Sequence, residues 1–83
     1  MKAKWTKKTP ANEGWYWIRY RNKRDETTQC PCHVSRFGGG GSLVRTAQND
    51  VFVEGPNHGG PGLKYNGKLD KTIRFGPAIP EPD

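Results

Sequence analysis

The run from Trp15 to Arg21 constrains the fold of this chain more than any other segment. It holds two Trp, two Tyr and one Ile between Gly14 and a polar stretch at 22–25. Aromatic and β-branched residues favour strands, and turn-forming residues bound this run, so it predicts a β-strand. Because side chains alternate along a strand, the predicted faces are Tyr16, Ile18 and Tyr20 on one side, and Trp15, Trp17, Arg19, Arg21 and Lys23 on the other.

Short strands separated by turns are predicted along the rest of the chain. Pro31 lacks a backbone donor and favours an edge strand or a bulge. The GGGGS run at 38–42, a unit also found in engineered linkers, predicts a mobile hairpin tip, and the Asn-Gly pair at 66–67 predicts a tight hairpin. The further predicted strands are 27–37, 43–47, 51–54 and 71–75. Without a helical period, we expect an all-β fold: a small antiparallel meander of about five or six short strands, as an open barrel or a strongly bent sheet.

The chain is short and poor in aliphatic side chains. Only 13 of its 83 residues are Leu, Ile, Val or Phe, and small cores of this kind are often completed by oligomerisation. Buried Trp and Tyr can offset the deficit, because each ring removes a large apolar area from water. We therefore expect one domain over 1–83 that forms a homo-oligomer, with an extended arm at 1–14 anchored by Trp5 and an extended Pro-rich tail at 76–83.

The two cysteines and the lack of long apolar runs bear on location and metal binding. No apolar run exceeds four residues, so neither a membrane span nor a signal peptide is predicted, and we expect a cytoplasmic protein without a membrane partner. Cys30, Cys32, His33 and a distant His58 are zinc-binding residue types. However, the single residue between the cysteines places both sulfurs on one strand face and His33 on the other. Buried, inert cysteines and no metal site are predicted.

The sequence carries no constellation typical of an enzyme. Catalysis needs a nucleophile beside a base, paired carboxylates or a metal, and the acidic residues here are scattered among turns and the tail. The Gly-rich segment 55–62 lacks the Gly-Lys-Ser/Thr end of a P-loop and contains two prolines. It predicts either a structural connector or an exposed loop that contacts a ligand through Asn57 and His58. We predict no enzymatic activity and no cofactor.

Positive charge is concentrated in the first third of the chain. Residues 1–24 hold eight basic residues and Glu13 alone, a net charge of +7, whereas 25–83 hold six basic and seven acidic residues, a net charge of −1. This asymmetry points to an anionic partner, such as a nucleotide, a nucleic acid or an acidic protein surface. A solvated basic segment that only keeps the chain soluble would have the same composition.

The aromatic and basic face of the strand at 15–21 is the candidate site. Bases stack on Trp or Tyr rings, and Arg binds phosphate through paired hydrogen bonds. The alternative is that Trp15 and Trp17 form the core and leave Tyr16 and Tyr20 outside. The predicted ligand-binding residues, with the last three in the Gly-rich loop, are Trp15, Trp17, Arg19, Tyr20, Arg21, Lys23, Arg24, His58, Gly59 and Gly60.

Both ends of the chain carry a recognisable pattern. The motifs are Trp5-Thr6-Lys7-Lys8-x-Pro10, then Gly14-Trp15-Tyr16-Trp17, and finally Gly76-Pro77-x-Ile79-Pro80-Glu81-Pro82. In these motifs the chain resembles small uncharacterised phage and prophage proteins that begin WTKxxPxxxGWYW and end GPxIPEP. The resemblance implies a phage-type accessory protein in the cytoplasm of the bacterial host, which acts by blocking a defence protein or by sequestering a nucleotide signal.

Three functional hypotheses follow from the charge, the aromatic run and the resemblance. The first is a non-enzymatic protein that binds an anionic ligand, in its most specific form a phosphate-bearing nucleotide of host defence. The second is a protein-interaction module that inhibits a host or phage enzyme through the same basic face. The third is a general nucleic-acid-binding module, whose affinity would fall steeply with salt.

Overall fold

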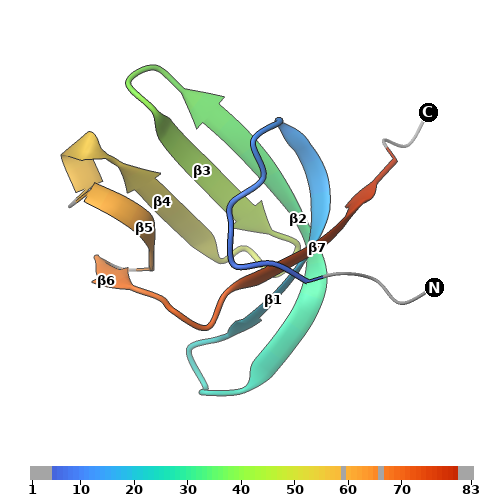
Figure 1. The fold of residues 1–83 in the computed structure, drawn as a ribbon. Coiled ribbons are helices and arrows are strands. Elements are labelled where there is room, and N and C mark those ends of the chain that lie inside the picture. Colours follow the sequence, from blue (N-terminus) through green and yellow to red (C-terminus); the bar gives the residue numbers. More distant parts are fainter. Residues whose placement is uncertain (1–4, 59, 66, 81–83) are drawn as a thin grey trace.

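Seven antiparallel strands form a single sheet (Figure 1). The computed structural model describes residues 5–58, 60–65 and 67–80. The elements along the chain are β1 (Gly14–Arg21), β2 (Thr27–Phe37), β3 (Gly41–Thr46), β4 (Val51–Gly55), the single 3₁₀ turn η1 (Pro56–His58), β5 (Gly60–Tyr65), β6 (Lys68–Leu69) and β7 (Arg74–Ile79). Their order in the sheet is β6-β5-β4-β3-β2-β1-β7.

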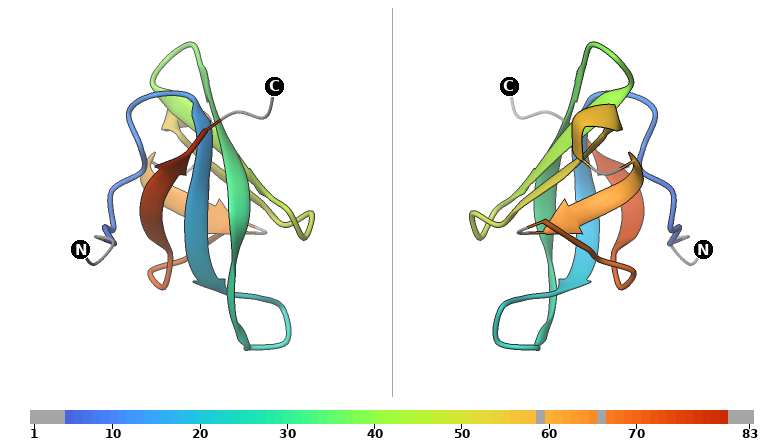
Figure 2. Two further views of the ribbon diagram at one scale, coloured as in Figure 1. Left: turned by 90° about the vertical axis from the view of Figure 1, so that its right-hand side faces the viewer. Right: turned by 90° about the vertical axis from the view of Figure 1, so that its left-hand side faces the viewer.

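The chain runs as a meander from β1 to β6, and β7 then returns to pair with the free edge of β1. The sheet is strongly bent, so that the half with β4, β5 and β6 faces the half with β7, β1 and β2 (Figure 2). It is not closed, because β6 and β7 are the two ends of the strand order. The predicted all-β antiparallel meander is confirmed as a strongly bent sheet, with seven strands instead of five or six.

β5 and β7 differ most from the sequence prediction, while β3 begins two residues earlier than predicted and the short β6 was not predicted. β5 lies partly in the Gly-rich segment, and Gly60 and Gly62 have φ values of +93° and +98°, which glycine adopts at little cost. β7 extends further into the predicted tail than 71–75. The extension contains a β-bulge, in which Gly76 and Pro77 together lie opposite Trp17. A bulge accommodates proline, which has no backbone N–H to donate to the neighbouring strand. Both strands are therefore specified by pairing and not by β-favouring side chains.

The inner face of the bent sheet forms the core. The Phe52 ring lies between two tyrosines, with centroid distances of 5.2 Å to Tyr20 and 5.1 Å to Tyr65. The buried apolar side chains are Ile18, Tyr20, Cys30, Cys32, Val34, Val44, Phe52, Leu63, Ile73 and Phe75. The core thus lies on the side of β1 that carries Ile18 and Tyr20, and the alternative in which the tryptophans of β1 form the core is wrong.

A polar cluster at the edge of this core joins β1, β5 and the turn between β3 and β4. The Asp50 carboxylate accepts hydrogen bonds from the Tyr20 hydroxyl and, at 2.8 Å, from the Tyr65 hydroxyl. The Thr46 hydroxyl lies 3.2 Å from the Tyr20 hydroxyl and accepts the Asp50 backbone N–H at 3.1 Å. Burial, reinforced by the bonds to Asp50, raises the pKa of Tyr20 and raises the pKa of Tyr65 to about 12.

The two cysteines of β2 face the core. Cys30 and Cys32 are free and buried, at 6% and 0% exposure. His33, the next residue of β2, points to the opposite side of the sheet. Burial, and then the neighbouring Cys30, raises the pKa of the Cys32 thiol to about 12. A buried thiol with a raised pKa is a poor nucleophile, so Cys32 has the environment of a structural cysteine.

Pro31 occupies an interior strand, although proline was expected at an edge or a bulge. Its carbonyl accepts the Ala47 N–H at 2.9 Å, just beyond the end of β3 at Thr46. The N and C=O of one residue point to the same side of a strand, so the missing donor of Pro31 also points past the end of β3. The proline therefore leaves out one bond to Ala47 at the end of the β2–β3 ladder and interrupts no pair inside it.

The N-terminal arm crosses β7 before it enters β1. Thr6 and Phe75 exchange two backbone hydrogen bonds of 2.9 and 2.8 Å. The Trp5 ring packs over Gly76, where an added Cβ would come within 3.0 Å of it, and the Arg19 guanidinium lies 4.1 Å from its centroid. These contacts attach the arm to the β1–β7 edge of the sheet.

The glycine run forms the β2–β3 hairpin tip. Gly39 and Gly40 have φ values of +83° and +85° in the turn. Gly41 already belongs to β3 and pairs with Phe37, whose ring lies 2.0 Å from the position that a Cβ would take. The last glycine of the run is therefore required by packing, whereas Gly39 and Gly40 are required by the turn.

Candidate functional site

The predicted site residues do not converge on one place. Tyr20 belongs to the core, so its predicted stacking on a base is wrong, because a ring at 1% exposure offers no face to a ligand. Gly59 lies outside the described residues. The others fall into three groups, which are Trp15, Trp17 and Arg19 on the outer side of β1, Arg21, Lys23 and Arg24 at the turn after it, and His58 with Gly60 between β4 and β5.

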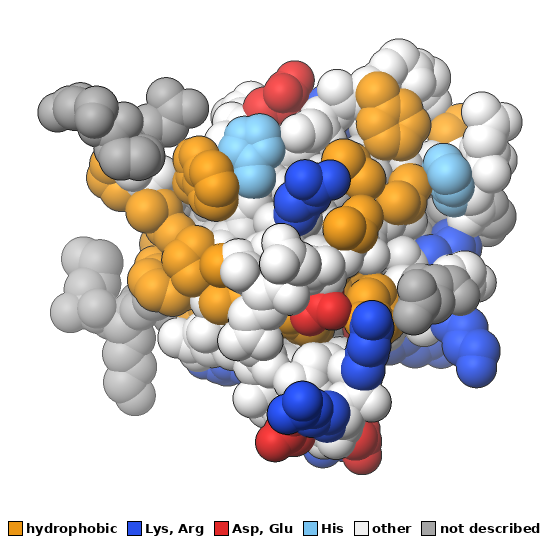
Figure 3. All heavy atoms as spheres, turned by 180° about the vertical axis from the view of Figure 1, so that it is seen from behind, with side chains coloured by type: hydrophobic (Ala, Val, Ile, Leu, Met, Phe, Trp, Pro, Cys, Tyr) orange, Lys and Arg blue, Asp and Glu red, His pale blue; other side chains and the backbone are white. Residues whose placement is uncertain are grey.

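The outer face is the side of the sheet opposite the core. We define it by the outward-pointing residues of β1 to β4 near its centre, which are Trp15, Trp17, Pro31, His33, Leu43, Arg45 and Val53. Figure 3 shows this side of the molecule, with hydrophobic side chains gathered around a basic one and with histidine beside them. No Asp or Glu occupies an outward position in these four strands, so the face is apolar and cationic.

One row of side chains crosses the outer face from strand to strand. Trp15 is directly opposite His33, and His33 is directly opposite Arg45. The Trp15 and His33 rings meet edge to face, with centroids 5.0 Å apart at 62°. Arg45 is exposed, and its side chain makes no hydrogen bond or ion pair with the described part of the chain. The row thus places two partly exposed rings beside an available guanidinium.

Arg19 has a structural role, and its phosphate contact stays a prediction. Its guanidinium donates two hydrogen bonds, of 3.2 and 3.1 Å, to the Gln29 side-chain oxygen across the β1–β2 pair. The same group lies over the Trp5 ring at 4.1 Å, a cation–π geometry. Arg19 therefore holds the arm on the sheet, and part of its hydrogen-bonding capacity is already used.

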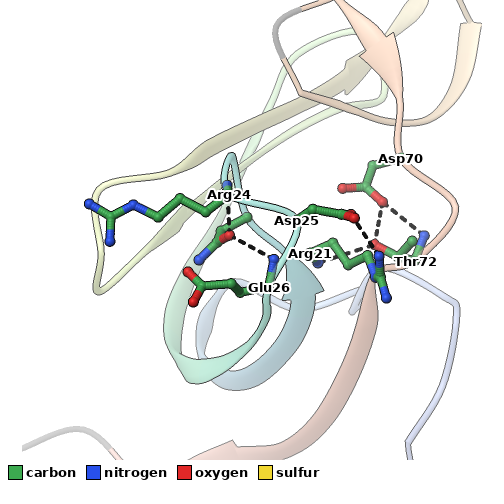
Figure 4. Close-up of polar contacts among 7 residues, drawn as sticks. Arg21, Arg24, Asp25, Glu26, Asp70 and Thr72 are labelled. Atoms are coloured by element: carbon green, nitrogen blue, oxygen red, sulfur yellow. Dashed lines mark hydrogen bonds and ion pairs between the residues drawn. The ribbon is translucent and has the colours of Figure 1, made fainter.

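The turn after β1 is organised by its own polar side chains. The Asn22 side-chain oxygen accepts the backbone N–H groups of Arg24 and Glu26 at 2.9 and 3.1 Å (Figure 4). Arg21 pairs with Asp25 at 2.6 Å. Because both partners are largely exposed, at 52% and 80%, the pair contributes at most about 1 kcal/mol.

Carboxylates offset the basic residues at this turn. Asp25 and Glu26 belong to the turn itself, and Asp70 lies close by, with its carboxylate bound to Thr72 (Figure 4). The Thr72 hydroxyl in turn accepts the Arg21 backbone N–H at 3.3 Å. The positive charge of Arg21, Lys23 and Arg24 is thus offset by acidic residues of the same turn and of the β6–β7 connection.

His58 lies at the far end of the sheet from this turn. Its exposed ring is 6.4 Å from the Phe37 ring at the end of β2, whereas the turn adjoins the start of β2 at Thr27. At about 3.3 Å per residue, the two ends of this strand are roughly 30 Å apart. Gly60 opens β5 and pairs with Gly55. These residues cannot complete a site with Arg21 or Arg24.

Sequence reasoning missed His33 and Arg45 as parts of the outer face. Neither residue is among the predicted ligand-binding residues, although both have the strand parity of outward residues. Within residues 5–58, 60–65 and 67–80, no group of three or more His, Cys, Asp or Glu could hold a metal ion. No helix in this part of the chain is long and apolar enough to cross a membrane. Comparison with known protein families, curated proteins and solved structures finds no match.

Proposed function

We propose that the outer face binds an anionic ligand that carries both bases and phosphates, as single-stranded nucleic acid and nucleotides do. The observation that supports this proposal is the row Trp15–His33–Arg45, in which two rings and an exposed cation lie side by side and no outward position of β1 to β4 carries an acidic residue. Stacking on an aromatic ring contributes about 1–3 kcal/mol per base, and a guanidinium binds phosphate through charge-assisted hydrogen bonds. The ligand is bound and not transformed.

The spacing of the row suits this ligand. Neighbouring strands lie about 4.7–4.9 Å apart, so Trp15 and Arg45, which are two strands apart, are separated by roughly 10 Å across the sheet. Val51 continues the row beyond Arg45, and Leu43 and Val53 form an apolar row beside it. A base that stacks on Trp15 and His33 would direct its phosphate toward Arg45, and the apolar rows would shield the contact from water.

The test is titration of a fluorescein-labelled thymidine oligonucleotide at low salt, followed by fluorescence anisotropy. Arg45→Gln should weaken binding about tenfold, the effect of losing a hydrogen bond to a charged group. Lys68→Gln, which removes the same charge from exposed β6, is the control and should leave binding unchanged. Equal losses in both variants would contradict the proposal, because they would indicate attraction by net charge alone.

The narrower form of the proposal is sequestration of a nucleotide signal by a phage-type accessory protein. Native mass spectra with linear and cyclic nucleotides would report the bound ligand and the subunit number together, and the homo-oligomer remains a prediction that the same spectra measure. If the oligonucleotide and every nucleotide fail to bind while an acidic peptide binds through Arg45, the face serves protein inhibition instead.

A further inference from the structure

A second cationic surface lies on the opposite, open side of the bent sheet. A cleft of about 690 Å³ separates the N-terminal arm and the start of β7 from the ends of β2, β4 and β5. The arm runs across this open side of the sheet before it reaches β1 (Figure 1). The charged residues that line the cleft are Lys7, Lys8, Arg36, Lys71 and Arg74, against Glu54 and Asp70. None of these residues belongs to the outer-face row.

The two carboxylates of the cleft are already bound to other groups. The Glu54 carboxylate accepts the Gly62 N–H at 2.9 Å, and the Asp70 carboxylate accepts the N–H and hydroxyl of Thr72 at 2.8 and 2.6 Å. The single ion pair within the described residues joins Arg21 to Asp25, outside the cleft. The five basic side chains therefore have no carboxylate of residues 5–58, 60–65 or 67–80 within ion-pairing distance.

Backbone carbonyls hold two of these cations in place. The Arg36 guanidinium donates a 3.2 Å hydrogen bond to the carbonyl of Pro10 in the arm. The Arg74 guanidinium donates to the carbonyls of Lys71 and Ile73 at 3.0 and 2.8 Å. Neutral acceptors orient a guanidinium without cancelling its charge. Like charges held near one another raise the energy of the empty cleft, and an anion would relieve this repulsion.

The cleft lining also indicates what kind of anion would fit. Its apolar residues are Ala11, Leu63 and Ile73, and none of its described lining residues is aromatic. A base would therefore find no ring to stack on, so recognition depends on charge. The volume lies within the range of about 300–1,000 Å³ that is usual for small-molecule sites. These features favour a compact ligand with several negative charges in a row.

We propose that this cleft binds a chain of phosphates, such as inorganic tripolyphosphate or the triphosphate part of a nucleotide. Lys7 and Lys8 contact the phosphates from the arm, while Arg36 contacts them from the end of β2 and Lys71 from the segment before β7. The arm is attached by Thr6 to β7, so binding also joins the arm to the end of β2. This site is separate from the outer face and does not depend on the function proposed for it.

The experiment measures tripolyphosphate binding by isothermal titration calorimetry at low ionic strength. Lys71→Gln should weaken binding about tenfold, and Arg36→Gln by a similar factor. The matched control is Lys68→Gln, which removes the same charge from a nearby exposed lysine outside the cleft. Circular dichroism spectra and thermal melts confirm that each variant is folded, and tripolyphosphate should raise the melting temperature of the wild type and the control.

Two results would overturn the proposal. The wild type would show no heat and no melting shift with tripolyphosphate, or Lys68→Gln would weaken binding as much as Lys71→Gln. Titration with adenosine triphosphate distinguishes the two ligand sources, since equal affinity for both means that only the phosphates are recognised. Cross-titration separates the sites, because Arg45→Gln should affect the oligonucleotide and Lys71→Gln should affect tripolyphosphate. If the wild type fails to bind the oligonucleotide, the result with tripolyphosphate still stands, and the reverse also holds.

Discussion

The inner and outer faces of the sheet are built from the same strands but differ in what their side chains contact. On the inner face, Phe52 is fully buried between tyrosines whose hydroxyls bond to Asp50. On the outer face, the Trp15 ring is partly exposed and meets His33, with Arg45 beside them. The core is thus formed by the inner face alone, and the Trp15 and His33 rings of the outer face remain accessible to a partner.

Truncation of the central inner ring should have the largest effect. Phe52→Ala should lower the free energy of unfolding by about 3–5 kcal/mol, through lost burial and the cavity that remains. This loss is comparable with the whole stability of many small domains. Urea denaturation followed by circular dichroism measures it.

A matched valine pair tests the difference between the faces directly. Val44 is fully buried on the inner face, whereas Val53 is partly exposed on the outer face. Val44→Ala should cost about 2 kcal/mol and Val53→Ala less than half as much, since it removes less buried apolar area. Equal costs would mean that the outer face is covered as completely as the core, and the proposed binding surface would then be occupied.

The aspartate beneath the tyrosines should matter more than an exposed one. Asp50→Asn replaces an acceptor of two hydroxyl hydrogen bonds by an amide, and should cost about 1–3 kcal/mol. Asp25→Asn breaks the exposed pair with Arg21 and should change stability by less than about 0.5 kcal/mol. Both are measured by urea denaturation at neutral pH. A larger effect at Asp25 would contradict the structural role assigned to the Asp50 cluster.

High pH should destabilise the inner face specifically. The pKa values of Cys32 and Tyr65 are raised to about 12 from ordinary values of 9.0 and 10.0, and the pKa of Tyr20 is raised as well. Each of these groups loses its proton at a lower pH in the unfolded chain than in the folded one. Its contribution to the free energy of unfolding is therefore complete below the unfolded pKa and disappears as pH rises through the folded pKa. The urea midpoint should therefore fall between pH of about 9 and 12. A constant midpoint over this range would show that these groups are not buried as described.

The smallest predicted effect concerns the attachment of the arm. An added Cβ at Gly76 would lie 3.0 Å from the Trp5 ring and 3.1 Å from the Trp17 Cβ, so one of them must shift. Gly76→Ala should cost about 1 kcal/mol or less and change the tryptophan fluorescence. The control is Gly38→Ala, where a Cβ meets nothing within 4 Å. Unchanged fluorescence in Gly76→Ala would show that Trp5 does not pack there.

The sequence predicted local strands well and long-range pairings poorly. The bounds of β2, Thr27 to Phe37, agree with the prediction at both ends, and the two faces of β1 were separated correctly. Which face of β1 is buried could not be derived, because both faces carry aromatic rings and the choice depends on partners such as Phe52. The predicted site residues lie apart for a similar reason, since residues adjacent in sequence, such as Arg21, have partners of their own, whereas Arg45 comes from another strand.

The return of β7 to the edge of β1 sets an order of events during synthesis. The segment 14–21 is made before its partner on that side, 74–79, and the whole of β2 to β6 is made between them. At about 5–20 residues per second, the wait is roughly 3 to 12 s. During this time the edge of β1 is open to the same segment of another nascent chain. Neighbouring nascent chains on one messenger RNA would thus have time to exchange this segment before β7 is made.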